Sequence, residues 1–343
     1  RPTSNIGLAD SLRNFEDRIV YRSTMDNERT FRSKYESRVL PFYKNGRFGE
    51  FAGVGGLKIR YLCFEKKNTS GALVVLPGKS ETYLKYAEFF YDLRDLNMSL
   101  YSMDHRGIGF SERMLPDRLK MHVEHFHDYL QDVRTFLDTV VKTGEHQHLF
   151  VLGHSTGSLI AALYLESYPE EFQAGVLCSP LFELNVGPVP GFALRALARL
   201  LDRPGRHEQY SLGQKNVKMP SFQNNTISHS YPRWSLWEQE IIPNTEAIQF
   251  GGVTNRWIRE SLLAGHRAVQ GAGQIKVPVL LLQAEQDSFT KTGAQDRFCR
   301  RAPLCRKVLM RGARHEILIE REDIRAAAIA HIKSFLKQQM RNG

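Results

Sequence analysis

The chain has 343 residues, of which 42% are hydrophobic and 24% charged, a composition ordinary for a globular protein with a real core. Its four cysteines are too few for a disulfide scaffold, and no apolar run approaches the ~18 residues of a membrane-spanning helix. The formal net charge is +10, but zinc-finger, helix–turn–helix and RNA-recognition signatures are absent from the sequence, so we expect no nucleic-acid partner.

Strands and helices are predicted to alternate along most of the chain. Residues 1–50 are charged and helical in pattern, and we expect them to form an N-terminal extension. Strands are predicted at 57–64, 72–76, 98–103, 149–152, 174–179, 277–283 and 306–310, and helices at 83–96, 123–141, 158–168 and 323–339. Buried strands that alternate with helices predict a mostly parallel central sheet flanked by helices on both faces.

The interval 184–273 interrupts this rhythm. It contains six prolines and all three tryptophans, Trp234, Trp237 and Trp257. We interpret it as a helical cap inserted between two strands of the sheet. The resulting division is an extension at 1–50, a core at 51–183 and 274–343, and a cap (lid) at 184–273. Because aromatic rings bury a large apolar area, at least one tryptophan is expected to line an apolar pocket. The alternative for each tryptophan is that it only joins the cap to the core.

The strongest motif is the segment 153–157, which reads Gly-His-Ser-Thr-Gly. It follows a buried strand and precedes a helix, which is the context that a nucleophile elbow requires. The glycines keep side chains out of a sharp turn, and Ser155 is held at a helix N-terminus that favours negative charge. The sequence therefore predicts that Ser155 is a nucleophile.

A serine nucleophile needs a base and an acid that orients the base. In the α/β-hydrolase fold they follow in the order Ser, Asp or Glu, His. His315 lies in the loop after the last strand and is the predicted base. Asp287 follows the strand at 277–283 and is the predicted acid, with Glu285 as the alternative two residues earlier.

An oxyanion needs two preorganised N–H donors. One is expected to be the amide of Thr156, directly after the nucleophile. The other is expected from the loop after the second buried strand, at the amide of Lys79, although this segment can also be a plain Pro-Gly turn. The side chains of Lys79 and His154 are further candidates for substrate contact.

Two other groups of charged residues are interpreted as structural. The segment 104–111 follows a strand near the expected site, and we expect its charged side chains to hold loops in place. His122, His125, His127 and Glu124 do not complete a set of metal ligands, so we expect no metal and no cofactor. Cys299 and Cys305 lie six residues apart, and whether they pair stays open because spacing alone does not fix their geometry.

Positive charge is concentrated near the C-terminus. Residues 291–343 hold 13 Lys and Arg against 5 Asp and Glu. The simple interpretation is a solvated basic surface. The functional interpretation is attraction to an anionic membrane surface or to aggregates of an acidic substrate.

These motifs together resemble a known family. The matching segments are Pro77–Glu81, Tyr86–Glu88, Asp104–Ser111, Gly153–Gly157, Arg259–Ser261, Leu263–Gly265, Leu282–Glu285, Asp296–Cys299 and His315–Leu318. From about residue 50 to the C-terminus, the chain resembles the bacterial lysophospholipase and monoacylglycerol-lipase-like branch of the α/β-hydrolases. The resemblance implies hydrolysis of a single acyl ester in a glycerolipid. The chain departs from it with Pro77-Gly78 in place of His-Gly, and with Thr156 where Met is common.

The leading hypothesis is a lysophospholipase with a Ser-Asp-His triad, an acyl-enzyme intermediate and a small lipid substrate. The alternatives are a monoacylglycerol lipase, a general carboxylesterase or thioesterase, and a catalytically silent lipid-binding module. A peripheral contact with an anionic membrane is expected, while the oligomeric state is not indicated. The expected location is the bacterial cytoplasm or the surface of the inner membrane, or the periplasm if a leader before Arg1 has been removed.

Overall fold

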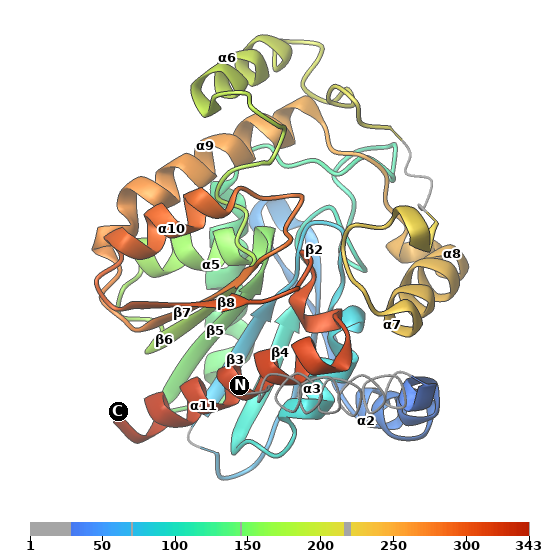
Figure 1. Cartoon of the computed structure of the whole chain (residues 1–343), viewed down its shortest axis with the longest axis vertical. Coiled ribbons are helices and arrows are strands. Elements are labelled where there is room, and N and C mark those ends of the chain that lie inside the picture. The colour runs from blue at the N-terminus through green and yellow to red at the C-terminus, as the bar shows by residue number, and fades with distance from the viewer. Residues whose placement is uncertain (1–28, 70, 145, 216–220, 343) are drawn as a thin grey trace, which may run out of the picture.

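A central sheet of eight strands organises the chain (Figure 1). The computed structural model describes residues 29–69, 71–144, 146–215 and 221–342. The strands are β1 (Arg47–Ala52), β2 (Lys58–Phe64), β3 (Gly71–Leu76), β4 (Met98–Met103), β5 (His148–His154), β6 (Ala174–Cys178), β7 (Val279–Ala284) and β8 (Cys305–Met310). Their order is β1-β2-β4-β3-β5-β6-β7-β8, and β2 alone runs antiparallel to both of its neighbours. The expectation of a mostly parallel sheet is confirmed.

Helices cover both faces of the sheet. The longer ones are α3 (Ala87–Leu93), α4 (His127–Phe136), α5 (Thr156–Ser167), α6 (Gly191–Leu201), α9 (Asn255–Gly271), α10 (Thr292–Arg301) and α11 (Glu322–Asn342). Shorter helical segments include η1 (Tyr35–Val39), α2 (Leu40–Lys44), η3 (Tyr83–Tyr86), η4 (Leu137–Val141), α7 (Tyr231–Ser235), η7 (Leu236–Ile241), α8 (Ile242–Asn244) and η10 (Ile317–Ile319). In Figure 1, α5, α9 and α10 lie on one side of the sheet, and α3 and α11 lie on the other.

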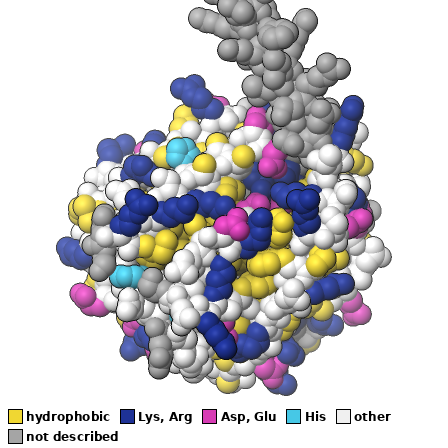
Figure 2. Space-filling model, turned by 90° about the horizontal axis from the view of Figure 1, so that it is seen from below, with side chains coloured by type: hydrophobic (Ala, Val, Ile, Leu, Met, Phe, Trp, Pro, Cys, Tyr) yellow, Lys and Arg dark blue, Asp and Glu magenta, His cyan; other side chains and the backbone are white. Residues whose placement is uncertain are grey.

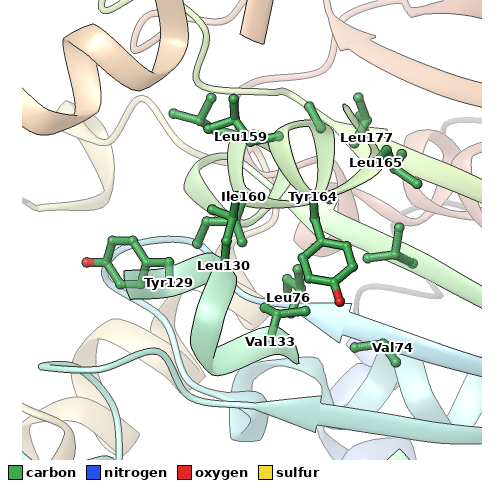
Figure 3. Packing of buried hydrophobic residues seen from close by; sticks show 14 of the residues in the cluster. Val74, Leu76, Tyr129, Leu130, Val133, Leu159, Ile160, Tyr164, Leu165 and Leu177 are labelled. Carbon is green, nitrogen blue, oxygen red and sulfur yellow. The ribbon is translucent and has the colours of Figure 1, made fainter. Parts of the chain in front are cut away.

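The alternation of side chains along each strand produces two cores. In β3, Val74 and Leu76 belong to the cluster under α4 and α5, where Figure 3 shows them close to Val133. Leu73 and Val75 point the other way, into the cluster under α3 and α11. All four β3 side chains are fully buried, as expected for a parallel strand covered on both faces.

Strand β1 was not predicted from the sequence. It begins at Arg47, inside the segment 1–50 that was expected to be an extension, and it pairs with β2 so that Phe51 lies opposite Ile59. It is an edge strand with mostly exposed side chains, so it lacks the apolar run that marks the inner strands. Of the expected extension, residues 29–44 are helical and residues 1–28 lie outside the described part of the chain.

The interval 184–273 contains α6, α7, η7, α8 and α9. It leaves the sheet after β6 and returns to β7, its direct neighbour. Several contacts join its middle part to the core, among them those of two arginines. Arg233 in α7 donates to Glu88 of α3 (2.8 Å), and Arg314 donates to the carbonyl oxygens of Asn225 (3.0 Å) and Ser228 (3.1 Å).

Cys299 and Cys305 form a disulfide that joins the end of α10 to the start of β8. The question that the sequence left open is thereby answered in favour of pairing. Among the helices of the described residues, none has the length and apolar character needed to span a bilayer.

Candidate active site

Ser155 occupies the sharp turn between β5 and α5. Its backbone has φ 51° and ψ −113°, a left-handed conformation that is rare for a residue with a side chain. The turn is possible because its flanking residues are glycines. A Cβ on Gly157 would lie 2.0 Å from the carbonyl oxygen of Leu76, and one on Gly153 would lie 2.4 Å from the backbone of Gly157. The motif therefore forms the strained strand–turn–helix of a nucleophile elbow.

The structure brings three of the predicted site residues into one hydrogen-bonded chain. Nε2 of His315 lies 3.0 Å from Oγ of Ser155, and Nδ1 of the same ring lies 2.9 Å from Oδ2 of Asp287. In the sequence, Ser155 lies 160 positions and Asp287 28 positions before His315. The imidazole is thus placed to accept the serine proton at Nε2 while it donates to the carboxylate from Nδ1.

The carboxylate of Asp287 is completely buried and richly hydrogen-bonded. Besides His315, it accepts from the amides of Phe289 (2.8 Å) and Thr290 (3.0 Å) and from the Thr290 hydroxyl (2.7 Å). Burial opposes the charge, but the hydrogen bond and charge of His315 and the bonds from Thr290 outweigh it and lower the pKa of Asp287. The group is an anion fixed in position, as an orienting acid has to be.

Glu285, the alternative acid, faces elsewhere. Its side chain is exposed, and Oε2 accepts from the amide of Gly312 at 2.7 Å. It makes no hydrogen bond to His315 among the contacts of the described residues. The geometry thus favours Asp287.

The two expected oxyanion donors come from adjacent strands. Thr156 is the first residue of α5, and Lys79 follows β3, which lies beside β5 with Leu76 opposite Gly153. The Lys79 side chain is half-buried, and its Nζ donates to Oγ of Ser80 at 3.1 Å. Burial lowers the pKa of the Lys79 ammonium to about 8, against the opposing charge of Glu81.

His154 lies beneath the nucleophile with both ring nitrogens bonded to the protein. Nδ1 is 3.1 Å from Oε2 of Glu81, and Nε2 is 3.2 Å from the carbonyl oxygen of His315. Neither nitrogen is free for the substrate contact that the sequence suggested. Glu81 also accepts from the amide of Gly78 at 2.6 Å and from the hydroxyl of Tyr86 at 2.6 Å. The Glu81 carboxylate thus binds the proposed oxyanion loop at Gly78 and the elbow at His154, and His154 in turn contacts the backbone of His315.

Lys85 completes this buried network. Its ammonium lies 3.1 Å from Glu81 and 2.6 Å from Glu316, the residue after the base, and it sits over the ring of Trp237 at 5.5 Å. The sequence analysis missed Glu81, Lys85 and Glu316. The four-residue spacing of the first two was a visible signal, but Glu316 is 231 positions from Lys85 and only the fold reveals the contact.

The three tryptophans of the cap are all buried, each in different surroundings. Trp257 belongs to the core cluster and donates from Nε1 to the hydroxyl of Tyr129 at 3.2 Å. Trp234 packs against Phe222 with ring centroids 5.3 Å apart. Trp237 lies over Lys85. In the described part of the chain these contacts are structural, and a role in binding an acyl chain stays a prediction.

The segment 104–111 holds loops in place, as expected. Asp104 accepts from the amides of Tyr83 and Phe110, each at 2.7 Å. Arg106 forms a buried pair with Asp132 at 2.6 Å. These bonds fix the chain around the loop beside the oxyanion segment.

His122 is engaged within the protein, with Nδ1 2.9 Å from the hydroxyl of Thr254 and Nε2 3.4 Å from Glu124. Across residues 29–69, 71–144, 146–215 and 221–342, no three His, Cys, Asp or Glu side chains gather in a way that could hold a metal ion.

A strained elbow serine, a hydrogen-bonded histidine and aspartate, and a cap inserted into a mostly parallel sheet define an α/β-hydrolase. The family model described as serine aminopeptidase, S33, matches residues 67–322, and the chain belongs to this family. The resemblance to the lysophospholipase and monoacylglycerol-lipase branch is likewise confirmed by the relatives below.

Lysophospholipase L2 of Escherichia coli (strain K12) is 32% identical over 305 residues, which are 87% of this chain and 89% of that protein. Monoglyceride lipase of Mus musculus is 27% identical over 225 residues, 65% of this chain and 68% of that protein. The chain is accordingly a carboxylic ester hydrolase that acts on lipid esters.

Solved structures support the fold. A soluble variant of monoglyceride lipase from Saccharomyces cerevisiae superposes with a TM-score of 0.69 at 17% identity, covering 86% of this chain and 95% of that chain. A carboxyl esterase from Bacillus coagulans gives a TM-score of 0.71 at 17% identity, covering 85% and 98%. At this level of identity the similarity concerns the fold alone.

Proposed function

We propose that the protein is a lysophospholipase that hydrolyses the single acyl ester of a lysophospholipid through Ser155, His315 and Asp287. The observation that carries the proposal is the hydrogen-bonded chain from Ser155 through His315 to Asp287 at 3.0 and 2.9 Å. The similarity to lysophospholipase L2, at 32% identity over most of both chains, supports the choice of substrate.

The reaction follows from the geometry. His315 Nε2 removes the proton of Ser155 Oγ as the oxygen attacks the ester carbonyl carbon, and the amides of Lys79 and Thr156 stabilise the resulting oxyanion. The imidazolium then gives its proton to the leaving glycerol oxygen, which departs as the alcohol. Water, deprotonated by the same nitrogen, attacks the acyl carbon and breaks its bond to Ser155 Oγ. The imidazolium returns its proton to Oγ, and the fatty acid leaves. Asp287 holds the imidazole tautomer throughout.

The substrate's phosphate has a candidate cation among the described residues. Lys79 extends from the proposed oxyanion loop, and its ammonium is bonded only to a hydroxyl among the described contacts. Two cations of residues 291–343 are already paired within the protein: Lys307 with Asp296, and Arg325 with Asp92. Lys79 is thus the better candidate for favouring a phosphate-bearing headgroup.

We also propose a peripheral contact with an anionic lipid surface through α6. Its apolar side chains are exposed, with Phe192 71%, Leu200 49% and Leu197 41% accessible. Arg203, just beyond the end of the helix, is exposed beside them. An amphipathic helix of this kind buries its apolar face in the headgroup region while its cations meet anionic lipids. In Figure 1, α6 projects at the end of the molecule beyond α9.

The end of the molecule opposite α6 in Figure 1 presents a mixed surface. Figure 2, seen from that side, shows lysine and arginine side chains interspersed with apolar and acidic ones.

Co-sedimentation with phosphatidylglycerol vesicles tests the proposed contact of α6 with an anionic lipid surface. The Leu197→Ser/Leu200→Ser variant should lose binding, and equal binding by wild type and variant would contradict it.

The catalytic proposal is tested by labelling and by turnover. A fluorophosphonate probe should label the wild type and not Ser155→Ala. Ser155→Ala and His315→Ala should each lose about a thousandfold or more in kcat without unfolding, and the double variant should lose little more. Near-normal turnover by either variant would refute the mechanism. A wild type that neither reacts with the probe nor turns over any ester would indicate a catalytically silent lipid-binding module.

The substrate is tested by comparing kcat/KM for lysophospholipids, monoacylglycerols and short p-nitrophenyl esters. A lysophospholipid should give the highest value. A higher value for monoacylglycerols or for short esters would favour a monoacylglycerol lipase or a general esterase, respectively.

A further inference from the structure

A groove of about 370 Å³ opens between α6, α9 and α10. This volume lies in the range of small-molecule sites, about 300–1,000 Å³. Helix α9 packs against both other helices, as Figure 1 shows, and the segment after β6 closes the inner end of the groove. None of the described residues that line it belongs to the triad, the proposed oxyanion loop or the network around Glu81.

The inner part of the groove is apolar. Phe182, Leu262 and Val269 contribute buried side chains, and Leu194 of α6 adds a half-buried one. At the floor of the groove, the backbone of α9 approaches the backbone of the segment after β6 closely. A Cβ on Gly265 would lie 2.2 Å from the carbonyl oxygen of Phe182. Such a surface suits an alkyl chain.

The charges around the groove are predominantly positive. Glu183 is the acidic side chain among the described lining residues, and it is already bonded to Lys291 (3.0 Å) and Arg297 (2.7 Å). Arg195 is half-buried, and within the described residues its guanidinium makes no ion pair or hydrogen bond. A partly desolvated guanidinium that lacks an acceptor is suited to bind a carboxylate or phosphate in bidentate fashion.

We propose that this groove is a second lipid site, which binds the anionic head of a single-chain amphiphile at Arg195 and its alkyl chain along Leu194, Leu262 and Val269. The head is a carboxylate or a phosphate monoester, so the ligand is a free fatty acid or a lysophosphatidic acid, the single-chain phospholipid that carries such a head. The site is separate from Ser155 and does not rest on the proposed function.

Calorimetric titration of protein whose nucleophile has been blocked with a fluorophosphonate isolates this site. The probes are dodecanoate, dodecyl phosphate, monododecanoylglycerol and inorganic phosphate, each below its aggregation concentration. Arg195→Gln removes the proposed anion contact. Arg199→Gln is the matched control, because it makes the same charge change one turn further along α6 on an exposed side chain that does not line the groove.

Dodecanoate or dodecyl phosphate should bind the blocked wild type, and Arg195→Gln should weaken that binding about tenfold while Arg199→Gln leaves it unchanged. The tighter of the two probes distinguishes fatty acid from phospholipid. The proposal is overturned if neither probe binds, if Arg195→Gln binds like Arg199→Gln, or if monododecanoylglycerol binds as tightly as the anions. It is also overturned if inorganic phosphate binds as tightly as dodecyl phosphate, because the apolar floor then contributes nothing.

If the fluorophosphonate does not label the protein, the proposed catalytic function fails while the groove remains testable. The same titrations are then made in the Ser155→Ala background, where the dissociation constants of the two arginine variants should differ by the same factor.

Discussion

His154 and Glu81 are hydrogen-bonded directly beneath the nucleophile, with 3.1 Å between Nδ1 and Oε2. The other ring nitrogen of His154 faces the carbonyl oxygen of His315 at 3.2 Å. Because both partners accept, both ring nitrogens must carry protons, and the ring is an imidazolium. Burial opposes this charge, but the charge and hydrogen bond of Glu81 outweigh it and raise the pKa of His154.

Glu81→Gln should therefore lower kcat about a hundredfold while fluorophosphonate labelling persists at a reduced rate, since small displacements of a base are costly. Because the pKa of His154 is raised in the folded protein, the stabilisation that its charge provides is present at low pH and is lost as pH rises through that pKa. The alkaline fall in activity should consequently move to lower pH in the variant. Glu50→Gln, an exposed carboxylate paired with Arg60, is the control. An unchanged pH profile in Glu81→Gln would show that the network does not position the base.

Asp287→Asn should reduce kcat by up to about ten-thousandfold, because an amide cannot fix the required tautomer or stabilise the imidazolium. Glu285→Gln should change kcat little, since its carboxylate caps Gly312 on the surface. Steady-state kinetics on one ester substrate measure both. A larger loss in Glu285→Gln would transfer the orienting role to that residue.

The choice between these two acids shows where sequence reasoning reached its limit. Both follow the buried strand β7 and lie two residues apart, so either satisfies the order of serine, acid and histidine. The turn after β7 decides between them, because the amides of Phe289 and Thr290 converge on Asp287. Those bonds depend on local backbone geometry that residue types alone do not specify.

Glu88→Gln should destabilise the fold by about 1–3 kcal/mol, because it removes the buried anion that Arg233 and Arg325 share. Each arginine still has another carboxylate partner, Glu322 for Arg233 and Asp92 for Arg325. Glu88 pairs with Arg233 of the cap at 2.8 Å and with Arg325 of α11 at 3.4 Å. Burial opposes ionisation, yet Arg325 and Arg233 lower the pKa of Glu88 to about 2. The stabilisation of the fold by the ionised Glu88 is therefore complete above the unfolded-state pKa near 4.5 and is lost as pH falls toward 2.

Urea unfolding at pH 7 and pH 3 measures this effect for Glu88→Gln and for the exposed control Glu50→Gln. The difference between Glu88→Gln and wild type should shrink at pH 3. If the two variants unfold at the same urea concentration at pH 7, the buried cluster does not stabilise the junction of cap and core.

Lys79→Gln should reduce the preference for a lysophospholipid over the matching monoacylglycerol by about tenfold, since a partly exposed pair contributes about 0–1 kcal/mol and a partly buried one somewhat more. With the pKa of the ammonium lowered to about 8 by burial, the wild-type preference should decline as pH rises through 8. It should also weaken with salt. Ratios of kcat/KM across a pH and salt series test this, and a ratio indifferent to pH, salt and the substitution would exclude Lys79 from substrate choice.

The sequence was most informative where structure is local. The elbow at Ser155 was predictable because strand, glycines and helix follow one another within a few residues. The network around Glu81 was not, because its contacts to His154 and Glu316 join residues far apart in the chain. The tryptophans were predictable only in part: their size predicts that they are buried, but whether they face a ligand or the core, as Trp257 does, depends on tertiary packing.

Among the described residues, no strand lies beside the outer edge of β8, the last strand of the sheet. An open strand edge of this kind is a template on which another chain can add. Here the edge carries exposed Arg306 and Lys307 next to the cysteine bridge. A second copy approaching edge to edge would bring like charges together, so the arrangement protects the protein against growth of its sheet into aggregates.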